Sequence, residues 1–196
     1  SWANLENGIV SACIQSSKWS GIIDADYGVF EVDENSLPIV IKSVKSVKSK
    51  VVIVLLNLFR DQLDRYGEVD VIAEKWKKAL ESLESPDRKT RGNNDVKIIA
   101  NADDPLIAHL GLHAKLPVIY FGVNDKTKYL GQMEHATDSI FCLNCTARLK
   151  YEGVYFSHIG IWKCPACGEK RPTPNIDMAV SPLPGLYNMY NTLASV

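Results

Sequence analysis

The sequence predicts an α/β fold, with a doubly wound, mostly parallel sheet and a small cysteine-rich unit inserted into it. Three observations support this fold class. Short apolar runs alternate with amphipathic segments as far as about residue 122. The run VVIVLL at 51–56 has the length and composition of a strand buried on both faces of a parallel sheet. Residues 139–172 interrupt this alternation and contain four of the five cysteines.

The individual elements follow from periodicity and from residues that begin or end helices. Apolar side chains three or four residues apart predict helices, and short β-branched runs predict strands. Ser36 is a suitable N-cap for a helix whose first turn holds Pro38. The expected helices cover 3–15, a segment beginning at 37, 68–84, 104–110 and 186–196. The expected strands cover 27–32, 50–57, 96–100 and 117–122.

The chain is expected to divide into three consecutive parts. Residues 1–138 form the main α/β domain, and residues 139–172 form the cysteine-rich insertion. Residues 173–196 return to the main domain through a proline-rich connection and end in a helix. One main core is the natural expectation for a chain of 196 residues.

The composition is that of an ordinary globular protein. Apolar residues make up 46% and charged residues 23%, and the net charge is -1, which argues against a disordered or strongly nucleic-acid-binding chain. The longest apolar run is too short for a transmembrane helix. Five cysteines, with Cys13 alone in a predicted helix, favour a reducing compartment and hence the cytoplasm. Because the chain begins SWANLENG, without Met, we expect that residues precede it.

The four clustered cysteines have the spacing of a zinc ribbon. Cys142 and Cys145 form one C-x-x-C pair, and Cys164 and Cys167 form the second after 18 intervening residues. Four thiolates complete a tetrahedral shell without an open position, so the predicted zinc is structural. Two redox pairs or inert thiols are the alternatives. His158 is a weaker candidate for a fifth ligand, and a surface histidine of the hairpin is the simpler interpretation.

Polar residues follow the predicted strands, where ligands bind in doubly wound sheets. Each has an ordinary structural explanation as well, as a helix cap, an acidic turn or a surface ion pair. Four clusters are of interest: Glu31 with Asp33 and Glu34, Asp61 and Asp64 with Arg60 and Arg65, Asp103 or Asp104 as an N-cap before Pro105, and Asn188 with Asn191 near a helix N-terminus.

Four motifs in order resemble those of the central ATP-binding domain of the Mur ligases. They are NLFRDQLDRYGE at 57–68, NADDP at 101–105, FG at 121–122 and GLYNMYNTLAS at 185–195. Gln62 stands where most members have His. Together with the four-cysteine insertion, Gln62 makes the chain similar to the branch of the superfamily that amidates lipid II.

The resemblance implies a reaction and its components. Enzymes of this branch use ATP and Mg²⁺ to convert the α-carboxylate of D-glutamate in the lipid II stem peptide into D-isoglutamine through an acyl phosphate. Ammonia comes from a glutaminase partner, GatD, and the enzyme acts at the inner face of the membrane. By this resemblance Glu31 is the Mg²⁺ ligand, and the nucleotide-site residues are Asn57, Gln62, Asp64, Asn101, Asp104, Asn188 and Asn191.

Several family features are absent from the chain as given. It contains no G-T-N-G-K-T-T phosphate loop and no C-terminal domain with the family's catalytic Asp and its GatD contact surface, so the chain alone is expected to be inactive. Trp76, flanked by Lys75 and Lys77, stands near the place of a carbamylated lysine of ordinary Mur ligases. Two alternatives remain: a zinc-ribbon module that contacts nucleic acid or protein, and an amino-acid-adding ligase, against which Gln62 and the ribbon count.

Overall fold

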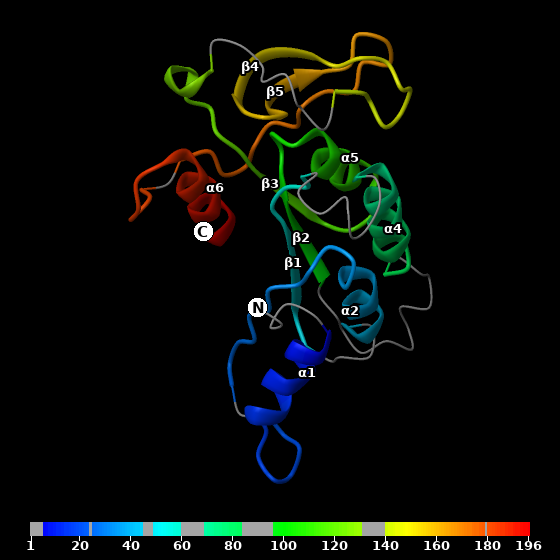
Figure 1. Cartoon of the computed structure of the whole chain (residues 1–196), viewed down its shortest axis with the longest axis vertical. Helices are drawn as coiled ribbons and strands as arrows, with labels where there is room; N and C mark the ends of the chain where they lie inside the picture. The colour runs from blue at the N-terminus through cyan, green and yellow to red at the C-terminus, as the bar shows by residue number, and fades with distance from the viewer. Residues whose placement is uncertain are drawn as a thin grey trace.

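The computed structural model describes residues 6–23, 25–44, 49–59, 69–83, 96–130, 140–178 and 180–196. Figure 1 shows the arrangement of the elements. The helices are α1 (Glu6–Gln15), α2 (Leu37–Val44), α4 (Val69–Glu81), α5 (Pro105–His113) and α6 (Leu186–Ser195), with a short 3-10 helix η2 (Lys126–Lys128). The strands are β1 (Val51–Leu55), β2 (Val96–Asn101), β3 (Val118–Phe121), β4 (Lys150–Phe156) and β5 (Ile159–Lys163).

The main sheet has three parallel strands in the order β1-β2-β3. Ile98 at the centre of β2 pairs with Ile53 on one side and with Val118 on the other. Each connection between neighbouring strands passes through a helix, which parallel pairing requires. The predicted parallel sheet is confirmed.

Helices cover both faces of this sheet (Figure 1). Ile98 and Ala100 are fully buried in the cluster that includes α2, α4 and α5, whereas Ile99 packs with the cluster that includes α6. Successive side chains of a strand point to opposite faces. Helix α6 therefore covers the face opposite to α4 and α5, as a doubly wound sheet requires.

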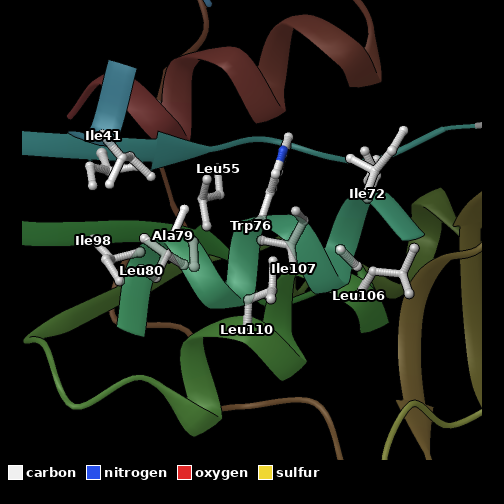
Figure 2. Close-up of a cluster of buried hydrophobic side chains, with 14 of the residues drawn as sticks. Ile41, Leu55, Ile72, Trp76, Ala79, Leu80, Ile98, Leu106, Ile107 and Leu110 are labelled. Carbon is white, nitrogen blue, oxygen red and sulfur yellow. The ribbon is translucent and has the colours of Figure 1, made fainter. Parts of the chain in front are cut away.

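The larger core lies between β1, β2 and the helices α4 and α5 (Figure 2). Trp76 of α4 is only 5% exposed, and its indole N–H donates to the backbone oxygen of Glu34 at 2.7 Å. Burying a large aromatic side chain contributes strongly to stability, and the hydrogen bond satisfies its one polar group. The position near the family's carbamylated lysine is therefore part of the core in this chain.

The cysteine-rich unit is an antiparallel hairpin of β4 and β5 that packs on the turn between β2 and α5. Trp162 of β5 is 2% exposed and donates its indole N–H to Ala102 O at 3.0 Å. The backbone N–H of Gly160 donates to Asp103 O at 2.9 Å. A Cβ at Gly160 would lie 2.3 Å from Gly153 O across the hairpin, so glycine is required there.

One predicted strand is wrong. Residues 27–32 form no strand, and Tyr27 and Val29 are 89% and 94% exposed. An alternating apolar pattern makes a strand only where a neighbouring strand supplies backbone partners and a face is buried, and neither condition is met here. The other predicted strands and helices are confirmed within a few residues at their ends, apart from residues 3–5 of the first helix and residues 68 and 84 of the third, which lie outside the described ranges. None of the described helices is both long and apolar enough to cross a bilayer.

Candidate functional site

The four cysteines of the hairpin converge on one point, although the two pairs are far apart in sequence. Cys142 Sγ lies 3.6 Å from Cys167 Sγ, and Cys145 Sγ lies 3.4 Å from Cys164 Sγ. All four sulfurs lie within 4.8 Å of one another. A tetrahedral shell with Zn–S bonds of ~2.3 Å places neighbouring sulfurs about 3.8 Å apart. The sulfur cage therefore has the donor set and spacing of a structural zinc site.

Both C-x-x-C turns fold in the same way. Thr146 N donates to Cys142 O at 2.8 Å, and Gly168 N donates to Cys164 O at 3.2 Å. Thr146 and Gly168 each follow the second cysteine of their pair and have positive φ values of 60° and 82°. Glycine adopts this backbone conformation without strain. The equivalent turns aim both pairs of sulfurs at a common centre.

The surroundings of the thiols differ. Burial raises the pKa of Cys142 to about 12, whereas the backbone N–H of Cys167, 3.5 Å from the Cys164 sulfur, lowers the pKa of Cys164 to about 6. A metal binds the thiolate form. The backbone N–H groups of the turn thus stabilise a thiolate before a metal contributes its own charge.

Asp104 joins three segments at the carboxyl end of the sheet. Its Oδ1 accepts from the N–H groups of Leu106 at 2.9 Å and Ile107 at 3.3 Å, which makes it the N-cap of α5. Its Oδ2 accepts from Leu58 N, 46 residues earlier in the chain, at 2.9 Å. The predicted N-cap is confirmed, and the same carboxylate also holds the segment that follows β1.

His158 reaches this place from the tip of the hairpin. Its side chain is fully buried, and its ring centroid lies 5.0 Å from that of Phe59. Nε2 lies 3.3 Å from Asp104 Oδ2 but makes no hydrogen bond within the described part of the chain. Both expectations for His158, a surface position or a fifth zinc ligand, are wrong, because the hairpin tip inserts beside the strand ends.

Asp103 is a second buried anchor, whereas the sequence predicted it only as a possible N-cap. Its Oδ1 accepts from Arg171 Nε, and its Oδ2 accepts from Tyr190 Oη and from Val123 N at 2.8 Å. Burial raises the pKa of Asp103, while the Arg171 guanidinium acts in the opposite direction. The carboxylate therefore links the turn after β2 with β3, the end of the hairpin and α6. The adjacent acidic residues in NADDP were the only sequence signal for this anchor.

The predicted nucleotide-site residues near the strand ends occupy two kinds of position. Asn101 is 1% exposed, and its Oδ1 accepts from Asp103 N at 2.9 Å, so it shapes the turn after β2. Asn57 is half-buried and immediately precedes Leu58. Because Asp104 binds Leu58, these segments lie together at one edge of the sheet.

The remaining predicted residues lie elsewhere in the chain. Asn188 of α6 donates from Nδ2 to Pro184 O at 2.7 Å, whereas Asn191 is exposed. Glu31, the predicted Mg²⁺ ligand, lies exposed in the irregular segment before α2. Gln62 and Asp64 lie outside the described residues.

Comparison with known proteins identifies the class to which this α/β chain belongs. Residues 21–196 match the Mur ligase middle domain, so the chain belongs to the Mur ligase family. Its similar relatives include the MurT subunit of lipid II isoglutaminyl synthase (glutamine-hydrolyzing) from Staphylococcus aureus strain COL, at 30% identity over 98% of this chain and 43% of the relative. The MurT subunit from Streptococcus pneumoniae strain R6 is 29% identical over the whole chain and 44% of the relative.

A solved structure supports the family fold. The pseudomurein peptide ligase type C from Methanothermus fervidus matches with a TM-score of 0.56 and 25% identity, over 80% of this chain and 32% of that protein. The chain therefore spans less than half the length of these relatives.

Proposed function

We propose that this chain is the central domain of an ATP-dependent carbon–nitrogen ligase that amidates lipid II in peptidoglycan biosynthesis. The carboxylate is the α-carboxylate of D-glutamate in the stem peptide. Its oxygen takes the γ-phosphoryl group of ATP to give an acyl phosphate and ADP. Ammonia then attacks the carbonyl carbon, phosphate leaves, and one proton is lost to give the carboxamide of D-isoglutamine.

The observation that carries this proposal is the similarity of almost the whole chain to two MurT subunits. The activity in their name, glutamine-hydrolyzing lipid II isoglutaminyl synthesis, requires both a ligase reaction and a source of ammonia. We infer from this name that a glutaminase subunit of the GatD type is the partner. We place the reaction in the cytoplasm, at the inner face of the membrane where lipid II is exposed.

ATP would supply the phosphoryl group, and Mg²⁺ would offset its negative charge during transfer. Asn101 and Asp104 use side-chain oxygens to shape the segments after β2 and β1, so we assign them the role of positioning the nucleotide site. Glu31 is our candidate Mg²⁺ ligand, because an exposed carboxylate retains free oxygen atoms for a hard cation. Asn57, Gln62, Asp64, Asn188 and Asn191 complete the proposed nucleotide site.

The sulfur cage fits a structural zinc ion, which we propose as a further cofactor. The cage closes the hairpin at the end opposite to the tip that carries His158. We infer that zinc keeps the hairpin rigid, so that the tip holds Phe59 and Asp104 at the strand ends. This role explains why a ligase domain would carry a zinc ribbon.

The test uses the full-length protein that contains this chain, co-expressed with its glutaminase partner. Purified lipid II, ATP, Mg²⁺ and glutamine are supplied, and muropeptides are analysed by mass spectrometry. We expect conversion of one carboxyl group to a carboxamide, dependent on both ATP and glutamine. Folded complex that leaves every stem-peptide carboxylate unchanged would contradict the proposal.

The same assay separates the alternatives. The solved relative is named as a peptide ligase, so addition of an amino acid is the second outcome to examine. Attachment of a whole residue, instead of a carboxamide, would assign the chain to the amino-acid-adding ligases. Affinity for nucleic acid that falls steeply with salt would favour a zinc-ribbon binding module instead, whereas our proposal requires no nucleic acid.

A further inference from the structure

A second group of metal-binding side chains lies beside the sulfur cage. His109 and His113 occupy positions i and i+4 of α5, so both rings project from one face of the helix. Their ring centroids are 4.3 Å apart. Glu169, directly after the glycine of the second cysteine turn, faces both rings. Neither the family assignment nor the proposed ligase reaction uses these three residues.

The donor atoms lie at distances that suit a shared metal ion. Glu169 Oε1 is 2.9 Å from His109 Nδ1, and Glu169 Oε2 is 3.2 Å from His113 Nε2. One donor atom from each residue lies within 4.8 Å of the other two. Bonds of about 2.0–2.2 Å to a tetrahedral zinc ion place neighbouring donors roughly 3.4 Å apart. Small side-chain rotations are therefore enough to complete the site.

The backbone holds the carboxylate at this place. Cys164 N donates to Glu169 O at 2.7 Å, and Gly168 turns the chain through its positive φ of 82°. The Glu169 side chain is only 10% exposed, and that of His109 only 8%. A largely buried carboxylate needs hydrogen-bond donors or a positive charge beside it, and a metal ion between Glu169 and the two rings would supply that charge.

We propose that His109, His113 and Glu169 form a second metal site, which takes a divalent transition ion of the zinc class. Two imidazoles and one carboxylate leave a fourth position open to water, unlike the closed sulfur cage. Imidazole donors favour zinc, cobalt or nickel over Mg²⁺ and Ca²⁺. His113 is 42% exposed and forms the solvent side of the site. This inference is independent of the ligase reaction.

The test is a metal titration of the full-length protein that contains this chain. Protein loaded with one equivalent of zinc is titrated with Co²⁺, and absorption is followed at visible and near-ultraviolet wavelengths. We expect a second metal equivalent, the added Co²⁺, to bind. Its visible absorption bands should be those of cobalt bound by nitrogen and oxygen ligands, without new sulfur-to-cobalt charge-transfer bands. His113→Ala and Glu169→Gln should each weaken this second binding roughly tenfold or more, and leave the first equivalent in place.

Glu152→Gln is the matched control. Glu152 lies on β4 of the same hairpin and pairs with Lys126 in an exposed position, so this change should leave both equivalents bound. Circular dichroism of each variant verifies that it is folded. Binding of a single equivalent by the wild-type protein, or a second equivalent that persists unchanged in His113→Ala and Glu169→Gln, would overturn the proposal and leave a Glu169–histidine hydrogen-bonded pair.

Discussion

The main α/β core and the cysteine hairpin differ in the contacts that hold them in place. Between the sheet and α4 the contacts are apolar, with side chains such as Ile72, Trp76 and Leu80 at helical spacing. The hairpin packs on the same domain through further apolar clusters and adds buried polar contacts, including those of Gly160 and Arg171 with Asp103. The periodicity of the sequence predicts apolar contacts at helical spacing, but it does not predict buried polar contacts between distant residues. Four sets of substitutions test this contrast.

The largest effect is expected from Cys142→Ser combined with Cys164→Ser. Removing one sulfur from each pair leaves too few thiolates for a closed shell, and zinc contributes about 10–16 kcal/mol to the folding of small zinc domains. We expect zinc content near zero and rapid hydrogen exchange over 140–172, measured by metal analysis and mass spectrometry. Cys13→Ser, outside the cage, is the control. Protection of 140–172 that survives zinc loss would show that the contacts with the main domain suffice to hold the hairpin.

Trp76→Ala tests the apolar region. Loss of this buried ring should destabilise the whole domain by about 4 kcal/mol, because a cavity forms and Glu34 O loses its donor. Chemical denaturation monitored by circular dichroism measures the change. Val71→Ala, at a half-exposed position of the same helix, should change stability by less than about 0.5 kcal/mol. Equal effects of the two substitutions would contradict the assigned core.

Arg171→Ala tests the polar contact between the two regions. The Asp103 side chain is fully buried and that of Arg171 is 10% exposed, so the substitution leaves a buried charge without its partner. We expect a loss of about 3 kcal/mol. Asp103→Asn combined with Arg171→Met should recover part of it, since both charges are then removed. Lys126→Ala, which breaks an exposed pair, should leave the denaturation midpoint unchanged.

The smallest of the four effects separates the two roles of Asp104. Asp104→Ala removes the cap of α5 and the acceptor for Leu58 N, with an expected cost of about 2 kcal/mol. Asp104→Asn retains a cap oxygen but places an amide donor or a rotated oxygen at Leu58, so about half of that cost should remain. Thermal denaturation of both variants measures the difference. If Asp104→Asn is as stable as the wild-type protein, the contact with Leu58 contributes little to the stability.

The predictions from sequence were accurate where local pattern determines structure. The parallel strands, the helices around them and the convergence of the four cysteines all follow from spacing within short segments. The strand at 27–32 was wrong because alternation alone cannot supply a neighbouring strand. His158 was misplaced because its burial depends on how the hairpin tip meets Phe59 and Asp104, not on its own neighbours in sequence.

The contacts that sequence reasoning missed join residues far apart in the chain. Arg171 binds an aspartate 68 residues earlier, and Glu169 meets a histidine 60 residues earlier. Neither pairing can be predicted from the residues next to each partner in the sequence. A lone arginine after a cysteine-rich hairpin is ordinarily interpreted as surface charge, and two histidines four residues apart as an ordinary helix face. Only the packing of the hairpin on α5 brings these groups together.

The three partners of Asp103 have a consequence for how the molecule opens. Because one carboxylate binds Arg171, Tyr190 and Val123, helix α6 cannot separate from the sheet without also releasing the end of the hairpin. We therefore expect these segments to exchange their amide hydrogens as one cooperative unit, with a shared opening free energy. Any ligand that draws α6 closer to the sheet would slow the opening of the cysteine hairpin as well.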